Sequence, residues 1–339
     1  MKNLNAIRPA PQELNESIRK PEQILDIKPN LVMIEPKFDG SFIYITRDSA
    51  TNASVLCTKD GNQLNLAPAV QQALLNHFSR FEDVLFEVEL EPQPWSEENK
   101  VKLNGNLYSG AELPFGIRVI IHDMLPLSEI GNPKTKAIDR YSNLLKLAGL
   151  PEVKAEKDFN PSNPKLHPRF WARYGQTTIC VTPTRLVTKE QASEIFSKGW
   201  ELGKAQKRVI IDGDSYEGTV LIDPDSLHKG GRSNKWKVKP FHTVDVKVTS
   251  FSSKDTGKVM TYEVKGEDTK TGEKIRVCTG ISPEFYKEVK DASQRFESVI
   301  VEVEALAIKS LAHGNPTLKN IRYDKMSPLQ KVGTGIEVE

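Results

Sequence analysis

The chain has 339 residues with a formal net charge of +2, and 27% of its residues are charged. This length exceeds one ordinary small core and suits two domains. The near balance of acidic and basic residues excludes a bulk basic protein, so any nucleic-acid surface must come from local clustering. The three cysteines lie far apart, which excludes a disulfide framework and a four-cysteine zinc site. No apolar run reaches membrane-spanning length and no secretory pattern opens the chain, so we expect a cytoplasmic protein without a membrane partner.

Strands and helices are mixed through the first 240 residues. Residues 1–30 are polar and contain prolines, which predicts a lead-in segment rather than a domain. Apolar runs between turn signals predict strands at 31–35, 42–46, 55–58, 84–90, 117–122 and 219–222. Helical periodicity predicts helices at 67–81, 137–148 and 188–204. The polar, glycine-bearing stretches 92–114 and 229–234 are expected to be loops, the second of them basic.

The pattern changes after Pro240. Short β-rich runs follow at 244–249, 260–264, 274–279 and 298–303, with one helix expected at 282–292. Several short strands and one helix in about 95 residues suit a small barrel such as the OB-fold. We therefore expect an α+β protein with mainly antiparallel sheets, divided into residues 1–240 and an OB-fold β-barrel at 241–339.

A lysine motif stands at the junction of two predicted strands, in the segment Glu35-Pro36-Lys37-Phe38-Asp39-Gly40. The pattern K-x-D-G is weak alone, since it arises by chance in roughly one chain in fifteen of this length. A β-hairpin with a surface lysine and an Asp-Gly turn would also explain it.

Five further segments support a functional interpretation of the lysine motif. They are FEVEL at 86–90, HDML at 122–125, EGTV at 217–220, KWKVKP at 235–240 and RYDK at 322–325. In this order they resemble the motifs of the covalent nucleotidyltransferases, which comprise ATP-dependent DNA ligases, RNA ligases and mRNA capping enzymes. The resemblance spans nearly the whole chain and implies a nucleotidyltransferase domain of the ligase (ATP-grasp-like) type.

The resemblance also implies roles for single residues. Lys37 would be the nucleophile that carries AMP, with Asp39, Lys237 and Lys239 as further catalytic residues. The residues implied to contact ATP are Glu35, Pro36, Lys37, Lys59, Glu89, His122, Lys237, Lys239, Arg322 and Lys325. Glu89 and Glu217 would hold Mg²⁺ or Mn²⁺, and the ring of His122 would stack on adenine.

These residue types suit the chemistry of lysine adenylation. A free lysine with a pKa near ~10.4 is neutral in only about one molecule in 2,500 at pH 7. Nearby positive charge, here from Lys237, Lys239 and the metal ion, would lower that pKa and neutralise the phosphates. The metal ion prefers oxygen ligands, which Glu217 and Glu89 supply.

The segment before the second lysine pair favours DNA as the substrate. The sequence G-G-R-S at 230–233 followed by W-x-K-x-K-P is most similar to DNA ligases, especially small two-domain enzymes of viruses and phages. We therefore expect a monomer that seals nicked duplex DNA in replication, repair and recombination, in the host cytoplasm if the source is viral. The predicted DNA-backbone contacts are Lys100, Lys102, Lys229 and Arg232. Nothing in the sequence indicates whether a sliding clamp recruits it.

Four positions depart from the DNA-ligase pattern. They are Phe42, Lys59, His122 and Ile222, where ligases usually have arginine, arginine, an aromatic residue and a basic residue. An RNA ligase or a capping-type transferase therefore remains an alternative, as does an inactive nucleic-acid clamp. An NAD-dependent ligase is set aside, because the extra N-terminal domain and the four-cysteine module of that family are not expected here.

Overall fold

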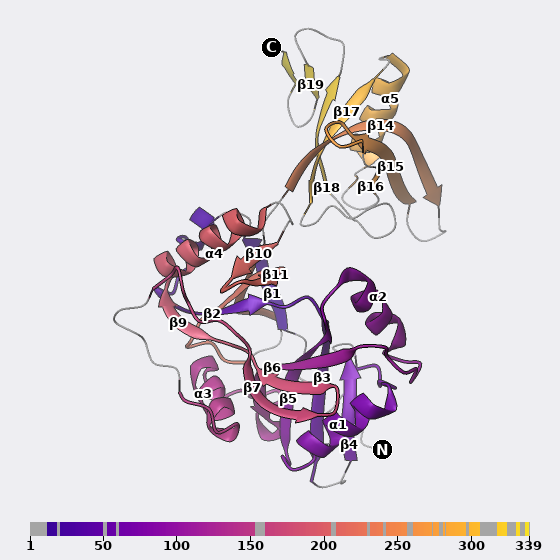
Figure 1. The fold of residues 1–339 in the computed structure, drawn as a ribbon. Coiled ribbons are helices and arrows are strands. Elements are labelled where there is room, and N and C mark those ends of the chain that lie inside the picture. Colours follow the sequence, from indigo (N-terminus) through magenta and orange to yellow (C-terminus); the bar gives the residue numbers. More distant parts are fainter. Residues whose placement is uncertain are drawn as a thin grey trace. The chain divides into compact units, whose positions relative to one another are not determined.

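The computed structural model describes most of the chain (Figure 1). The described residues are 12–18, 21–49, 53–58, 61–152, 160–204, 208–228, 231–239, 242–255, 260–272, 274–277, 281, 283–295, 298–305, 317–323, 330–332 and 336–338. The chain divides into two compact units, Met1–Lys239 and Pro240–Glu339.

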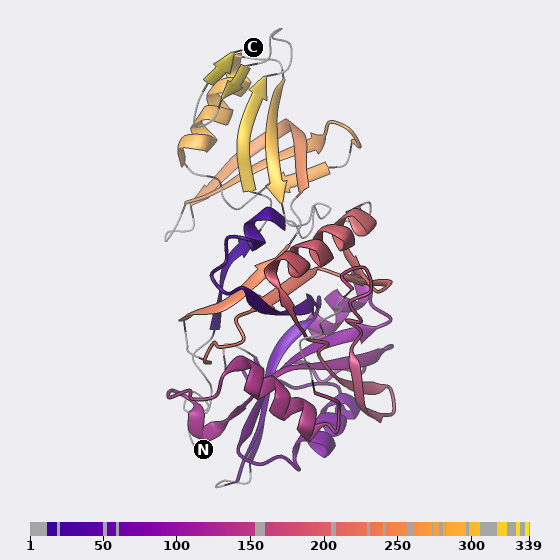
Figure 2. The same cartoon turned by 90° about the vertical axis from the view of Figure 1, so that its left-hand side faces the viewer.

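The first unit contains a five-stranded sheet that carries the lysine motif. Its strands, in spatial order, are β1 (Gln12–Ile18), β13 (Gly231–Val238), β12 (Gly218–Ile222), β2 (Leu31–Lys37) and β9 (Arg185–Thr188). All neighbours pair antiparallel except β1 and β13, which are parallel. The helix α4 (Lys189–Gly203) contacts β2 and β9 of this sheet (Figure 2).

A six-stranded sheet forms the rest of this unit. Its strands, in spatial order, are β4 (Ala53–Thr58), β3 (Ser41–Asp48), β5 (Val84–Gln93), β6 (Gly116–Pro126), β8 (Thr177–Val181) and β7 (Arg169–Tyr174). The other elements of the unit are η2 (Pro21–Ile24), α1 (Pro68–Phe78), α2 (Glu97–Asn106), η3 (Leu127–Glu129), α3 (Ala137–Leu147), β10 (Val209–Ile211) and β11 (Asp214–Tyr216). Because β2 belongs to one sheet and β3 to the other, residues 38–40 carry the chain from sheet to sheet.

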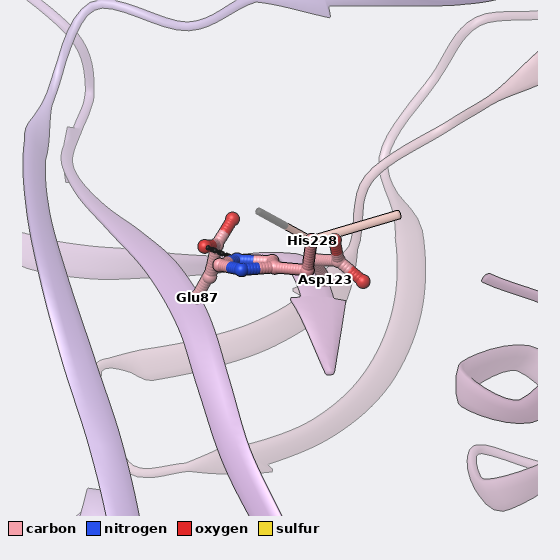
Figure 3. A group of neighbouring side chains, drawn as sticks. All are labelled: Glu87, Asp123 and His228. Carbon is pink, nitrogen blue, oxygen red and sulfur yellow. Dashed lines mark hydrogen bonds and ion pairs between the residues drawn. The ribbon is translucent and has the colours of Figure 1, made fainter. Parts of the chain in front are cut away.

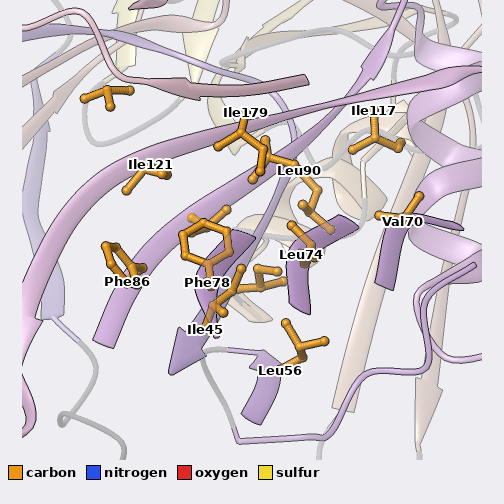
Figure 4. Packing of buried hydrophobic residues seen from close by; sticks show 14 of the residues in the cluster. Ile45, Leu56, Val70, Leu74, Phe78, Phe86, Leu90, Ile117, Ile121 and Ile179 are labelled. Atoms are coloured by element: carbon orange, nitrogen blue, oxygen red, sulfur yellow. The ribbon is translucent and has the colours of Figure 1, made fainter. Parts of the chain in front are cut away.

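Two hydrophobic clusters hold these sheets. One lies under the six-stranded sheet, where Leu74 and Phe78 of α1 meet Phe86, Ile121 and other strand residues (Figure 4). The other joins β2 and β12 to α4 through residues such as Ile34, Leu221 and Phe196. Each fully buried side chain of this size contributes about 1.5–3 kcal/mol. The cores thus fix the strands whose ends carry the predicted motifs.

Three predictions for this unit are wrong. Residues 1–30 are not only a lead-in, because they contain β1 and η2 and bury Ile24 in a core. The stretch 92–114 is not simply a loop, because α2 forms within it and Ser96 caps its start by accepting a hydrogen bond from the Asn99 amide (3.1 Å). Of the expected loop 229–234, residues 231–234 belong to β13, whereas 229 and 230 lie outside the described residues.

The second unit is β-rich with one helix. Its sheet has the order β16 (Lys274–Val277), β15 (Met260–Asp268), β14 (His242–Asp255), β17 (Val299–Ala305), β18 (Thr317–Tyr323), β19 (Gln330–Val332) and β20 (Ile336–Val338). The helix α5 (Pro283–Arg295) contributes Val289 and Ala292 to a small core. Among the described residues no pairing joins β16 to β20, so the OB-fold barrel remains a prediction.

Membrane-spanning length is not reached by any helix in the part of the chain that the structure describes.

Candidate active site

Strand pairing brings three segments of the sequence to one edge of the five-stranded sheet. The strand β12 lies between β2 and β13 and runs antiparallel to both, so it begins where they end. Gly218 is opposite Lys37, and the Glu217 amide donates a hydrogen bond to the Lys37 carbonyl (3.0 Å). Lys239 follows directly after β13. Lys37, Glu217 and Lys239, which are three of the predicted site residues, therefore lie close together.

The carboxylate of Glu217 bridges the two amines. Lys37 Nζ lies 2.7 Å from Glu217 Oε2, and Lys239 Nζ contacts Glu217 Oε1. Burial, followed by the charge of Lys37, lowers the pKa of Lys239 to about 7, against the opposing charges of Asp39 and Glu89. The Lys37 side chain is 21% exposed and that of Lys239 is 11% exposed, so the site is sheltered but open to a ligand.

Two glycines allow the backbone segments of the site to approach closely. The Gly40 amide donates a hydrogen bond of 2.5 Å to Glu89 Oε1, and a Cβ at this position would collide with the Leu90 carbonyl. A Cβ at Gly218 would collide with the Val238 carbonyl and lie 3.3 Å from the Cα of Lys239. Glycine is therefore required at both places for steric reasons.

Three glutamates lie in a row on β5 of the six-stranded sheet. Glu87, Glu89 and Glu91 occupy alternate positions and so share one face of the strand. Each has its own cationic partner: Arg118 holds Glu91 (Nε to Oε2, 2.9 Å), and His122 lies 3.3 Å from Glu89. Each of the three glutamates therefore lies beside a basic side chain.

His122 lies between two carboxylates. Its Nε2 is 3.3 Å from Glu89 Oε2 and its Nδ1 is 3.6 Å from Glu35 Oε2. Burial disfavours the imidazolium, but Glu35 and Glu89 outweigh it and raise the pKa of His122 to about 9. Its ring is tilted against Phe38, with centroids 5.8 Å apart. Stacking on adenine stays a prediction.

Asp39 is held by two cations. Arg208 Nη1 lies 2.8 Å from Asp39 Oδ2, and Lys100 Nζ pairs with Oδ1. Burial raises the pKa of Asp39, but both cations outweigh it and leave the pKa below its ordinary value. The indole of Trp95 lies under the Arg208 guanidinium at 4.2 Å and donates to the Asp39 carbonyl (3.3 Å). Arg208, Lys100 and Trp95 thus hold Asp39 in place two residues after Lys37.

A second ionic cluster is buried beside this site. Its members are Glu87, Asp123, Arg140, His228 and Lys235. His228 Nε2 lies 2.6 Å from Glu87 Oε1 (Figure 3), and Lys235 Nζ lies 3.5 Å from Glu87 Oε2. Arg140 binds Asp123 through Nε (2.9 Å) and Nη2 (2.8 Å). Burial raises the pKa of both carboxylic acids, but the cations outweigh it and hold both pKa values below their ordinary values.

The carboxylates offer two places where a metal ion could be held. Glu87, Asp123 and His228 have ligand atoms within 4.8 Å of one another. Arg140 and Lys235 already neutralise these carboxylates, so this cluster does not fit a divalent cation. Glu217 fits better, because its side chain is 28% exposed and its ion-pair partners among the described residues are two lysine amines. Glu89 is already engaged by Gly40 and His122, which makes it the weaker donor.

The remaining predicted residues lie in different places. Glu35 is buried and accepts a hydrogen bond from Thr184 (2.9 Å), and Pro36 is buried next to it. Lys237 faces Val220 in the pairing of β13 with β12 and has no ion pair with a described residue. Lys102 pairs with Glu98 (2.7 Å) on the exposed side of α2.

The last five predicted residues are two arginines in strands and three lysines. Arg232 lies in β13 and Arg322 in β18. Lys59, Lys229 and Lys325 lie outside the described residues.

Sequence reasoning missed several residues of the site. Arg208 and Trp95 belong to no motif, and His228 was not singled out. A signal existed for Glu87 and Lys235, because each stands two positions from a predicted site residue and so shares its strand face. For Arg208 we find no such signal.

Comparison with solved structures identifies the fold. A structure named Pmar-Lig_Pre aligns with a TM-score of 0.61 and 18% identity, covering 93% of this chain and 67% of that one. A second, from a study of DNA binding with a minimal scaffold by Lig E DNA ligases, aligns with a TM-score of 0.56 and 16% identity, covering 92% of this chain and 100% of that one. No family model and no curated protein sequence matches. The chain therefore shares its fold with solved ligase structures. In the second of them, the shared fold is that of a DNA ligase.

Proposed function

We propose that this protein is an ATP-dependent DNA ligase that seals nicks bearing a 5′-phosphate and a 3′-hydroxyl. The observation that carries the proposal is the placement of Lys37, whose amine lies 2.7 Å from Glu217 beside Lys239 in a sheltered site. A surface lysine in a hairpin would have neither partner. The DNA-ligase fold supports the same assignment.

The first step is adenylation of Lys37. Its amine attacks the α-phosphorus of ATP, a P–N bond forms, and pyrophosphate leaves. The ammonium of Lys37 must first lose a proton, and the Glu217 carboxylate is the group in contact with it. Lys239 and Lys237 supply positive charge for the phosphate oxygens.

Two further steps complete the seal. AMP passes from Lys37 to the 5′-phosphate of the nick and forms a 5′–5′ pyrophosphate link. The 3′-hydroxyl then attacks that phosphate and expels AMP. Glu217 would hold Mg²⁺ or Mn²⁺, which when bound neutralises phosphate charge. Asp39 lies two residues after Lys37, at the position where the DNA ends would meet the enzyme.

DNA is the preferred substrate on two grounds. The solved structure from the Lig E study concerns DNA binding by DNA ligases, and its fold is shared over 92% of this chain. The basic side chains Lys102 and Arg232 could then contact backbone phosphates. The enzyme would act as a monomer in replication, repair and recombination.

Covalent labelling tests the proposal. Incubation with α-³²P-ATP and Mg²⁺ should leave label on the denatured protein, and Lys37→Ala should abolish it. Lys198→Ala, which removes a surface lysine paired with Glu194, is the matched control and should label normally. Retention of label by Lys37→Ala would sink the assignment. Sealing of DNA/DNA, RNA/DNA and RNA/RNA nicks with ATP or GTP then separates DNA ligase from RNA ligase and capping activity.

A further inference from the structure

The carboxylate of Asp39 occupies a site built from two cations. Arg208 Nη1 lies 2.8 Å from one of its oxygens, and Lys100 pairs with the other. The side chains of Asp39, Lys100 and Arg208 are 12%, 16% and 13% exposed, so water screens them only in part. Such a pair of donors on one small anion is the arrangement that binds phosphate groups in proteins.

Neighbouring residues hold Arg208 in place without Asp39. Its guanidinium lies over Trp95 at 4.2 Å, Nε donates to Ser215 Oγ (3.3 Å), and Nη2 donates to the Ser215 carbonyl (3.3 Å). Lys100 projects from α2, a helix anchored by its own cap at Ser96. Both cations would therefore remain near their positions if Asp39 moved away.

Positive charge exceeds negative charge at the side chain of Asp39. Lys100 and Arg208 bring two positive charges against the single negative charge of this carboxylate. A group with two negative charges would restore balance better than one carboxylate does. Any phosphate that exchanges AMP with Lys37 must also approach this region, because Asp39 follows Lys37 by two residues.

We propose that Lys100 and Arg208 form a binding site for a terminal phosphate group, and that Asp39 occupies it when no phosphate is bound. The ligand would be pyrophosphate or the 5′-phosphate of a DNA end, which share this chemistry. The inference rests on the proposed function for its choice of ligands. The test of the site itself measures only binding and does not require catalysis.

Binding of inorganic pyrophosphate to the unadenylated full-length protein tests the site. By isothermal titration calorimetry, Lys100→Gln and Arg208→Gln should each weaken binding at least about tenfold. Asp39→Asn should tighten it several-fold, because it removes the resident competitor but keeps the side-chain shape. Lys198→Gln, on the exposed face of α4, is the matched control and should bind like the wild type.

A purely structural role for the three residues gives a different result. If Asp39 only ties Lys100 of α2 and Arg208 to residues 38–40, Asp39→Asn should lower the free energy of unfolding and leave the affinity for pyrophosphate unchanged or lower. Thermal melting of each variant checks that the fold persists, and Arg208→Lys, which keeps the charge, serves if Arg208→Gln does not fold. Affinity within twofold of the wild type for Lys100→Gln and Arg208→Gln, or no tightening in Asp39→Asn, overturns the proposal.

A second binding assay identifies the source of the phosphate. Affinities are measured for two nicked duplexes that differ only in a 5′-phosphate or a 5′-hydroxyl at the nick. If the site takes the DNA end, the wild type prefers the phosphorylated nick and Lys100→Gln loses that preference. If only pyrophosphate binding changes, the site takes the leaving group of ATP. An equal loss of affinity for both duplexes, with pyrophosphate unaffected, shows ordinary backbone contacts and overturns the proposal. All these readings stand even if labelling shows that the protein does not self-adenylate.

Discussion

Single residues of the site carry charges whose state depends on their partners. His122 is protonated by virtue of Glu35 and Glu89, which raise its pKa to about 9. Lys239 is driven the other way, because burial and Lys37 lower its pKa to about 7. At neutral pH the site therefore holds an imidazolium beside an amine that is only partly protonated, whereas free side chains would show a largely neutral imidazole and a fully protonated amine.

The raised pKa of His122 predicts a pH-dependent stability. Since the folded-state pKa lies above the unfolded value of about 6.5, the stabilisation is complete below pH 6.5 and is lost as pH rises through 9. The wild type should exceed His122→Gln by at most about 3 kcal/mol at pH 6, with the difference shrinking towards pH 9.5. Urea denaturation at several pH values measures it, and a difference independent of pH would contradict the assigned charge.

The strand β13 links the buried cluster to the active site. Lys235 lies in that cluster, Lys237 follows on the same face of the strand, and Lys239 contacts Glu217 directly after the strand ends. A buried ion pair often contributes little net stability, but removing one partner leaves an uncompensated charge. The cluster thus fixes the position of the strand that leads to Lys237 and Lys239, the two lysines proposed to bind phosphate.

Breaking this cluster should therefore be costly. Lys235→Met is expected to lower the free energy of unfolding by about 3–5 kcal/mol, because Glu87 loses a buried partner. Adding Glu87→Gln to that variant should recover part of the loss. Denaturation of the two single variants and the double variant gives the coupling energy. Strictly additive losses would show that Lys235 and Glu87 do not interact.

Elements with a local pattern could be predicted, and those that depend on distant partners could not. Apolar runs between turn signals located β2, β3 and β5, and ordered motifs located Lys37 and Glu217. The strand β1 was missed because its partner β13 lies more than two hundred residues away. The helix α2 was missed because only Leu103 of its residues is buried, so it has no apolar face.

The contacts of the site follow the same rule. Arg208 reaches Asp39 across 169 positions of sequence, and His228 reaches Glu87 across 141. No local spacing encodes such contacts. Lys37, Glu217 and Lys239 could be predicted because each stands in a segment that resembles a family motif, whereas the cations around Asp39 could be found only from the fold.

At the scale of the whole molecule, each unit has a hydrophobic core of its own. Leu74 is fully buried in the first, and Ile275 is 2% exposed in the second. Separate cores allow separate unfolding.

Calorimetry should therefore resolve two transitions. Leu74→Ala and Ile275→Ala each remove a buried side chain at a cost of about 2–5 kcal/mol. Each substitution should lower the midpoint of one transition and leave the other within a degree or two. A single transition that both substitutions shift equally would show that the two cores unfold together.

The alternation of side chains along β13 limits how this part of the chain can change. Lys235 and Lys237 share one face because one residue stands between them, and Lys239 follows directly after the strand. Inserting or deleting a single codon between them would place one of these lysines on the opposite face unless a β-bulge absorbed the change. Gaps in related sequences should therefore fall mainly outside residues 235–239.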